Sequence, residues 1–422
     1  MHDFEYKEDN KLYCEDVPVE KIAREVGTPF YLYGLHTLRR HYQVFDKAFE
    51  EIPRIICYST KANSNIAILK TFINEGSGLD IVSGGELYRA LKAGADPKKI
   101  VYAGVGKTEE EIRYALESDI LLFNVESSQE LVAINDVASK LNKKALVALR
   151  INPDIDPKTH PYISTGLKQS KFGIDMDQAL VDCEKAKNLK HVEIAGIHIH
   201  IGSQIVETTP FVDAVVRIEG FVKKLRGMGF DIRYLDVGGG LGIAYEKESP
   251  PEPSEFAKAV IPVLKRMNCT VLFEPGRVIV GNAGVLVAKV LYIKTTKEKN
   301  FVIVDAAMND LMRPTLYGSY QNIIPAEKLD FGNSKIVADV VGPICESGDF
   351  LAKERVLPNL KQGDLLAVMS AGAYGFSMSS NYNSRPRVAE VMVDGSSYHI
   401  IKNREKYEDL IKGEKIPEFL KK

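Results

Sequence analysis

The chain has 422 residues, of which 45% are hydrophobic and 27% charged, and its formal net charge is −2 at pH 7. This length suffices for two domains with a large core, and the composition is that of a globular enzyme. The near-zero net charge gives no reason to expect nucleic acid or an anionic membrane as a partner.

The first residues and the cysteines point to a reducing compartment. The N-terminal segment, residues 1–5, is acidic and has no apolar stretch, so we expect no signal peptide. No apolar run approaches the ~20 residues of a membrane span. The five cysteines are scattered and form no CxxC pair, which argues against disulfides and a zinc site. We expect a cytoplasmic protein.

The first 33 residues contain two short β-rich pieces around one helix. The β-rich pieces are residues 11–15 and 30–33, and the helix opens at Pro18 and stops at Gly27. We expect these elements to join the C-terminal β domain described below.

Eight β-rich runs follow between residues 54 and 275, and segments with helical periodicity fill most of the intervals. The runs are 55–59, 79–82, 100–103, 121–124, 146–151, 194–199, 234–237 and 271–274. The helical segments are 65–74, 85–93, 108–118, 128–141, 176–186, 211–228 and 254–267. Alternating strands and helices predict parallel pairing and fit a closed (β/α)₈ barrel, here residues 34–283. A doubly wound open sheet is the structural alternative.

After residue 284 the pattern changes to that of an antiparallel β domain. The strand-like runs are 284–295, 301–306, 335–341, 364–369, 388–393 and 397–401. The pair Asp394-Gly395 between the last two is a strong hairpin signal. We assign residues 1–33 and 284–422 to this second domain, a β-sandwich or β-barrel.

Lys61 stands just beyond the first barrel strand, where that strand gives way to a helix. A lysine at the mouth of a buried strand is poorly placed for solvent, and its amine can form a Schiff base with an aldehyde cofactor. Most lysines in such a position cap an element or extend to solvent. A catalytic role for Lys61 therefore depends on which residues stand at the ends of the other barrel strands.

The last two barrel strands run into a glycine-rich segment and an acidic residue. The seventh strand is followed by Gly238-Gly239-Gly240, and the eighth by Glu274-Pro275-Gly276-Arg277. Loops after these strands commonly bind phosphate in barrels, and glycines let backbone N–H groups close on a phosphate. A simple tight turn is the alternative interpretation of the glycines. The spacing does not match a dinucleotide-binding fingerprint.

The sixth strand ends with His198 and His200, which lie two apart and should both face the barrel interior. A metal pair would need further ligands at other strand ends, and we expect no metal. A buried core histidine is a sufficient interpretation of His198, whereas His200 suits stacking on a flat ring. A lysine, a stacking histidine, a glycine cradle and an acid at one barrel mouth together predict pyridoxal 5′-phosphate.

The motifs resemble those of the fold type III, alanine racemase-like pyridoxal-phosphate decarboxylases, most closely the diaminopimelate decarboxylases. The resemblance runs nearly end to end. Its segments are residues 58–63, 160–166, 198–204, 238–240, 274–277, 345–349 and 372–376. The lysine and Glu-Pro-Gly-Arg motifs are shared with the wider family, whereas residues 160–166 and 345–349 look specific to the diaminopimelate branch.

The resemblance implies decarboxylation of meso-2,6-diaminopimelate to L-lysine and CO₂, the last step of lysine biosynthesis, in a homodimer with active sites at the subunit interface. The implied catalytic residues are Lys61, which carries the cofactor, His200, which stacks on its ring, and Cys345, the proton donor from the other subunit. The implied cofactor-binding residues are Lys61, His200, Ser203, Gly239, Gly240, Glu274, Pro275, Gly276, Arg277 and Tyr374. The implied substrate-binding residues are Arg277, Arg313, Tyr317, Glu346 and Tyr374.

The chemistry at the far end of the substrate can also be argued directly. Diaminopimelate carries a second carboxylate and ammonium there, and Arg277 and Arg313 with Glu346 supply both opposite charges. The nearest rival is a decarboxylase of another basic amino acid, such as ornithine or carboxynorspermidine. Alanine-type racemisation, a non-catalytic cofactor-binding protein and a metal-dependent barrel hydrolase are further alternatives.

Overall fold

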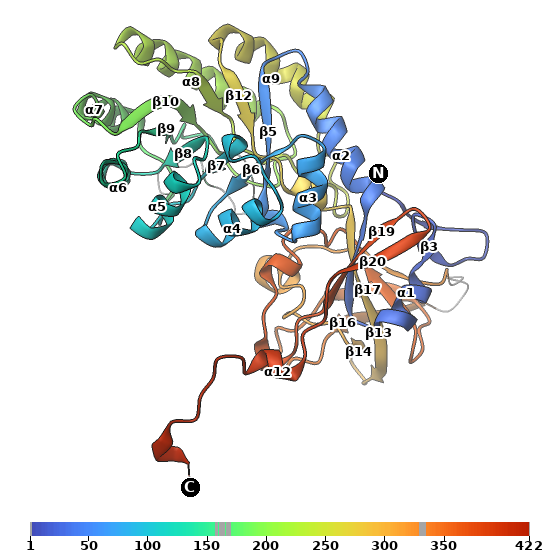
Figure 1. Cartoon of the computed structure of the whole chain (residues 1–422). Helices are drawn as coiled ribbons and strands as arrows, with labels where there is room; N and C mark the ends of the chain where they lie inside the picture. Colours follow the sequence, from blue (N-terminus) through green and yellow to red (C-terminus); the bar gives the residue numbers. More distant parts are fainter. Residues whose placement is uncertain (1, 157–158, 160–164, 166–169, 329–334, 422) are drawn as a thin grey trace. The chain divides into compact units, whose positions relative to one another are not determined.

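The computed structural model describes residues 2–156, 159, 165, 170–328 and 335–421. The chain forms two compact units, one of residues 38–281 and the other of residues 1–37 with 282–422 (Figure 1). Among the described residues, no helix has the length and apolar character needed to cross a bilayer.

Eight parallel strands close residues 38–281 into a barrel, which confirms the predicted fold. Around the barrel the order is β10 (Val192–His198), β11 (Tyr234–Asp236), β12 (Thr270–Phe273), β5 (Arg54–Ser59), β6 (Gly78–Ile81), β7 (Ile100–Tyr102), β8 (Leu122–Val125) and β9 (Ala145–Arg150). Each strand lies at one of the eight predicted runs. These strands are buried on both faces, so their sequences are nearly continuous apolar runs.

Helices follow the strands and cover the barrel. They are α3 (Ile66–Asn74), α4 (Gly84–Lys92), α5 (Glu109–Glu117), α6 (Ser128–Lys140), α7 (Met176–Ala186), α8 (Thr209–Gly227) and α9 (Pro253–Met267). At α5 the Thr108 hydroxyl accepts from the Glu111 backbone N–H at 3.2 Å, and the Glu111 carboxylate accepts from the Thr108 N–H at 3.0 Å. This capping box explains why the sequence predicted the start of α5 so closely.

One long helix departs from the sequence prediction. α2 (Leu35–Ala48) begins directly after β4 (Phe30–Gly34), and its first turn contains no acidic residue. Without a capping residue or a change in hydrophobic pattern, the sequence offers no visible boundary between this strand and this helix.

The second unit is built on a sheet with the order β17 (Ala352–Pro358), β16 (Lys335–Val341), β14 (Asn300–Val304), β13 (Gly284–Thr295), β4, β19 (Ala389–Asp394) and β20 (Ser397–Lys402). β18 (Leu365–Val368) pairs with β13 and with β15 (Ile323–Pro325). β4 pairs with β13 and β19 in this sheet. The pairs β14·β16 and β4·β19 are parallel, so the sheet is mixed and not purely antiparallel.

The N-terminal residues before β4 form a small sheet of their own within this unit. It consists of β1 (Phe4–Tyr6), β2 (Leu12–Cys14) and β3 (Val17–Pro18), followed by α1 (Val19–Val26). The 11–15 piece therefore contributes to a separate three-stranded sheet. The described residues also form short helical elements, among them η1 (Thr60–Ala62), α10 (Arg277–Val280), α11 (Arg313–Tyr317) and α12 (Tyr407–Leu410).

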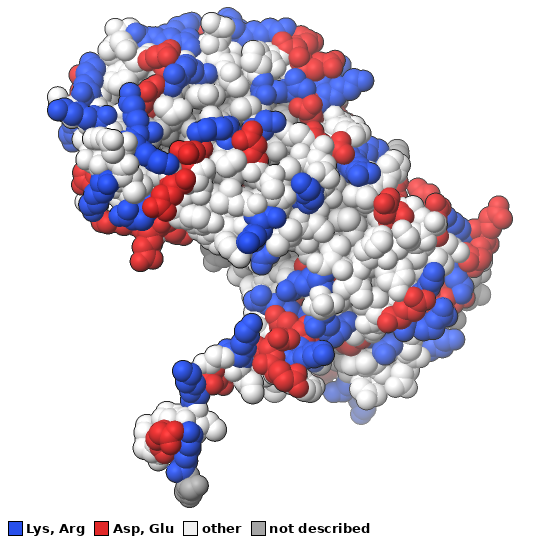
Figure 2. Space-filling model, viewed as in Figure 1, with Lys and Arg blue, Asp and Glu red and all other residues white. Residues whose placement is uncertain are grey.

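Charged side chains of both signs are intermingled on the face shown in Figure 2. Several are paired on the barrel surface, for example Lys144 with Glu193 at 2.9 Å and Lys265 with Glu51 at 2.6 Å. Exposed pairs of this kind contribute roughly 0–1 kcal/mol each. The stability of the barrel therefore rests mainly on its apolar interior.

Candidate active site

Lys61 lies in the η1 turn that follows β5, and its amine points to the end of the neighbouring strand β6. Lys61 Nζ is 2.9 Å from Asp80 Oδ2, and the Ser59 hydroxyl donates to the same oxygen at 2.7 Å. The Asp80 side chain is fully buried, whereas one third of the Lys61 side chain is exposed. Burial and Glu274 raise the pKa of Asp80, and Lys61 lowers it. The lysine is therefore held by a buried anion but remains reachable.

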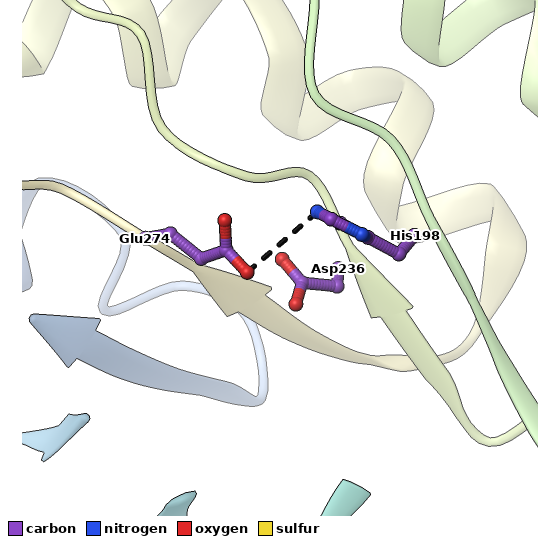
Figure 3. A group of neighbouring side chains, drawn as sticks. All are labelled: His198, Asp236 and Glu274. Atoms are coloured by element: carbon purple, nitrogen blue, oxygen red, sulfur yellow. Dashed lines mark ion pairs between the residues drawn. The ribbon is translucent and has the colours of Figure 1, made fainter. Parts of the chain in front are cut away.

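Glu274 follows β12 and sits in a buried group with His198 from β10 and Asp236 from β11 (Figure 3). Its Oε1 is 3.6 Å from His198 Nε2, and its backbone N–H donates to Gly238 O at 2.8 Å. Burial raises the pKa of Glu274, but His198 and Lys61 outweigh it and hold this pKa well below its ordinary value. Glu274 is consequently an ionised acid inside the barrel.

His200 lies two residues beyond His198, after the end of β10. Its Nδ1 accepts a hydrogen bond from the Gly239 N–H at 3.2 Å, which places the ring proton of the neutral form on Nε2. Burial, Arg150 and Lys61 lower the pKa of His200 well below its usual value. The side chain is therefore a neutral flat ring, attached to the glycine segment.

The glycine segment after β11 is packed too closely for any side chain. A Cβ on Gly239 would lie 2.2 Å from the carbonyl oxygen of Glu274, and one on Gly240 would lie 2.6 Å from that of Gly202. Gly238 and Gly240 also have φ angles of +69° and +118°, which other residues rarely adopt. The run is thus required by the backbone geometry and is more than a generic turn.

Arg277 begins α10 directly after the Glu-Pro-Gly segment, and its side chain is buried. It donates to the Tyr245 hydroxyl at 2.7 Å and to the Ser203 hydroxyl at 3.0 Å. The structure therefore brings Ser203 and Arg277, both predicted site residues, into direct contact. Gly276 packs against Ser59 and Ala62, so this loop also lies beside the Lys61 turn.

The remaining predicted site residues lie in the second unit. Arg313 begins α11, is buried, and has its guanidinium 6.0 Å from the ring centre of Tyr317. Cys345 is exposed, and its N–H donates to Asn383 Oδ1 at 2.8 Å. Glu346 Oε2 accepts from the Tyr382 hydroxyl at 2.7 Å. Tyr374 has a φ of +55°, a conformation that is uncommon for a residue with a side chain.

Three polar residues of the barrel interior had no assigned role in the sequence analysis. They are Asp80 and Asn124, each the last residue but one of its strand (β6 and β8), and Asp236, the last residue of β11. A polar residue that closes an otherwise apolar run was the available signal. The predicted motif 160–166 lies outside the described residues apart from Thr165, whose hydroxyl donates to His200 O at 2.9 Å.

Comparison with known proteins places the chain in a family. Residues 35–281 match the family described as pyridoxal-dependent decarboxylase, pyridoxal binding domain. The chain is 53% identical over 411 residues to diaminopimelate decarboxylase of Vibrio cholerae, which covers 97% of this chain and 98% of that protein. It is 49% identical to the enzyme of Aquifex aeolicus, with 96% of each covered.

Solved structures agree over nearly the whole chain. Diaminopimelate decarboxylase from Helicobacter pylori complexed with L-lysine has a TM-score of 0.90, with 43% identity and coverage of 93% of this chain and 98% of that chain. The M. jannaschii enzyme in complex with L-lysine has a TM-score of 0.93, with 37% identity and 98% of each chain covered.

The barrel residues fit pyridoxal phosphate, the cofactor of this family. Lys61 offers the amine, Glu274 offers an ionised partner for the ring nitrogen, and neutral His200 offers a flat surface. The N–H groups of Gly238 and Gly239 already donate to Asp236 and His200, so Gly240, whose Cβ position is blocked, is the glycine of this segment that offers its N–H to a phosphate. The chain belongs to the pyridoxal-dependent decarboxylase family, in its diaminopimelate decarboxylase branch.

Proposed function

We propose that the chain decarboxylates meso-2,6-diaminopimelate to L-lysine and CO₂, the last step of lysine biosynthesis, in the cytoplasm. The observation that carries this proposal is the strand-end group in which Lys61 pairs with buried Asp80 while Glu274 stays ionised. Relatives of about half identity over nearly full length, all named for this reaction, support the choice of substrate.

Lys61 would hold the cofactor covalently, and Glu274 would bind the ring nitrogen. Bound pyridoxal phosphate supplies an electron sink for the pair of electrons left when the bond from Cα to the carboxylate breaks. Glu274 favours this because an ionised carboxylate keeps a proton on its partner nitrogen. His200 would stack on one face of the cofactor ring. Because its pKa is lowered, His200 is neutral and places no second positive charge beside the protonated ring nitrogen.

Ser203, Gly240 and the backbone of Gly276 and Arg277 would bind the phosphate, and the adjoining Gly239 and Pro275 would line the cofactor site. Ser203 is already oriented by its hydrogen bond from Arg277. Gly239 lies against the backbone carbonyl of Glu274, so the glycine segment packs directly on the segment that carries Glu274. A phosphate bound there would therefore fix the ring in relation to Glu274.

The substrate and proton-donor roles involve the second unit. Arg277 and Arg313 would bind the distal carboxylate of the substrate, and Glu346 would bind its distal ammonium, with Tyr317 and Tyr374 alongside. Cys345 would return a proton to Cα. Its exposed position supports a donor supplied across the interface of a homodimer.

The substrate is tested by measuring CO₂ release from meso-diaminopimelate, ornithine, carboxynorspermidine and lysine with the purified holoenzyme. We expect turnover of diaminopimelate to exceed the others by at least about a hundredfold, because only it carries the distal carboxylate. Faster turnover of ornithine would overturn the proposal. Lys61→Ala should abolish both turnover and the absorbance of bound cofactor, whereas Lys70→Ala, on the exposed face of α3, should change neither.

Subunit sharing is tested by mixing two inactive variants, Lys61→Ala and Cys345→Ala. If Cys345 acts on the partner's substrate, random exchange gives mixed dimers with one intact site, and activity should recover to about a quarter of wild type. No recovery, with subunit exchange verified by a size tag, would show that Lys61 and Cys345 act within one chain.

A further inference from the structure

Glu274 shares its buried surroundings with a second acid and with an amide that contacts both. Asn124 on β8 donates from Nδ2 to Asp236 Oδ2 at 3.0 Å and to Glu274 Oε1 at 3.3 Å. Asn124 and Asp236 are completely buried, and Glu274 is nearly so. A side-chain amide nitrogen carries two hydrogens, so one can go to each carboxylate.

The same acids and His198 could be taken for a metal site, since their ligand atoms all lie within 4.8 Å of one another. The amide of Asn124 argues against this, because it points N–H groups at both carboxylates, where a cation would require lone pairs. The two carboxylates are therefore arranged as hydrogen-bond acceptors of one amide.

Asn124 is also held through its backbone. Its backbone carbonyl accepts a hydrogen bond from Lys107 Nζ at 2.8 Å. Lys107 is buried and forms an ion pair of 2.6 Å with Glu130. Asn124 Oδ1 has no hydrogen-bond partner among the described residues, so the amide is oriented by the two acids alone.

Asp236 is fixed from its other oxygen. The Gly238 N–H donates to Asp236 Oδ1 at 2.9 Å, so the acid also joins the start of the glycine segment. Burial and then Glu274 raise the pKa of Asp236 to about 8. Two neighbouring acids cannot both be ionised cheaply, and the opposite directions of their pKa shifts favour the proton on Asp236 and the charge on Glu274.

We propose that Asn124 and Asp236 are positioning residues that hold Glu274 in one orientation as a carboxylate for the ring nitrogen of the cofactor, an inference that rests on the proposed function. Asn124 donates one hydrogen to each acid, and protonated Asp236 supplies a neutral neighbour in place of a second negative charge. Without the amide, Glu274 is free to turn or to take up a proton, and its hold on the ring nitrogen weakens.

The test compares the affinities of two ligands that differ only at the ring nitrogen. Cofactor-free full-length protein is titrated with pyridoxal phosphate and with the analogue in which that nitrogen is replaced by carbon. The ratio of the two dissociation constants reports the partner of the nitrogen, because a general loosening of the site would weaken both ligands alike.

We expect Asn124→Leu, which removes both donors at similar size, to reduce the wild-type preference for pyridoxal phosphate about tenfold to a hundredfold, the factor that corresponds to one hydrogen bond to a charged group. Asn124→Ser keeps one donor, so its preference for pyridoxal phosphate should lie between those of the wild type and Asn124→Leu. The serine variant serves as the test if the leucine variant does not fold. The control is Asn135→Leu, the same exchange on α6, where the amide oxygen accepts from the His191 N–H.

Wild-type preference in folded Asn124→Leu or Asn124→Ser would overturn this inference and leave the proposed function standing. A wild-type protein that binds both ligands equally would contradict the role of Glu274 in the proposed function itself. A loss confined to the Asn124 variants, with Asn135→Leu unchanged, would establish the positioning role.

Discussion

Lys61 Nζ and Asp80 Oδ2 form an ion pair of 2.9 Å between a cation that solvent can reach and an anion that it cannot. The pair has a structural consequence that can be tested without cofactor. Lys61→Met leaves Asp80 buried with Ser59 as its remaining donor. We expect a loss of about 1–3 kcal/mol in the free energy of unfolding near pH 8, measured by urea denaturation.

The loss should depend on pH in a defined direction. Burial and Glu274 raise the pKa of Asp80 in the folded state, and removing Lys61 raises it further. Between the unfolded and folded pKa values the folded protein binds the extra proton, so its stability falls as pH rises. Lys61→Met should therefore lower the free energy of unfolding less near pH 5 than near pH 8. The double variant Lys61→Met, Asp80→Asn should recover most of the free energy lost near pH 8. An equal loss at both pH values would contradict the pairing.

Gly239→Ala should damage both the barrel and its phosphate loop. The new Cβ would lie 2.2 Å from the Glu274 carbonyl oxygen, a backbone atom that can move only with its loop. We expect destabilisation of about 1–3 kcal/mol and weaker cofactor binding. Gly220→Ala is the matched control, since its Cβ meets nothing within 4 Å on an exposed position of α8, and it should stabilise by up to about 1 kcal/mol. Thermal denaturation and cofactor titration measure both effects.

Asp310→Asn should remove a pH-dependent weakness of the second unit. Asp310 is buried and accepts from the Ala307 N–H at 2.9 Å, and burial raises its pKa to about 7. Relative to an unfolded value of about 4, the ionisation of Asp310 above pH 7 destabilises the folded state by about 4 kcal/mol. The stability of the variant relative to wild type should rise from pH 4 to pH 7 and then level off. Asp394→Asn, at the exposed end of β19, is the control for the exchange itself, and a flat profile for Asp310→Asn would refute the assignment.

The barrel was predictable because its information is local. A strand buried on both faces must be apolar along its length, as in β5 and β9, and the intervening helices carry caps such as Thr108. The strands that were not predicted from the sequence lack these signals. β17 contains three charged residues in succession, followed by an exposed valine, and β15 is three residues long and ends in Pro325.

The site was predictable only where chemistry leaves a motif. Lys61, the glycines and Glu274 stand at strand ends with residue types that suit one cofactor. Asn124 and Asp236 do not, because their importance comes from the pairing of strands far apart in the chain. Strand β10 pairs with β11 so that His198 stands opposite Asp236, and the closed barrel brings Asn124 on β8 within hydrogen-bond distance of Asp236 and Glu274. Such a meeting across 112 residues of chain leaves no pattern in the sequence.

Tyr245→Phe should show how far the position of the Arg277 side chain depends on its hydrogen bond to Tyr245. The guanidinium of Arg277 is buried and donates to the Tyr245 hydroxyl at 2.7 Å and to the Ser203 hydroxyl at 3.0 Å. Removal of one acceptor leaves a charged N–H group with poorer solvation, at a cost of about 1–3 kcal/mol. If Arg277 binds the substrate carboxylate, KM for diaminopimelate should rise about tenfold or more as the side chain shifts.

A control separates this effect from the loss of any tyrosine hydroxyl. Tyr88→Phe, on the exposed surface of α4, should leave KM and stability unchanged. Ser203→Ala gives a second comparison, because it removes another acceptor of Arg277 together with a proposed phosphate ligand, and it should weaken cofactor binding as well as substrate binding. If Tyr245→Phe instead lowers stability but leaves KM at the wild-type value, Arg277 has a structural role in the barrel and a different cation binds the distal carboxylate.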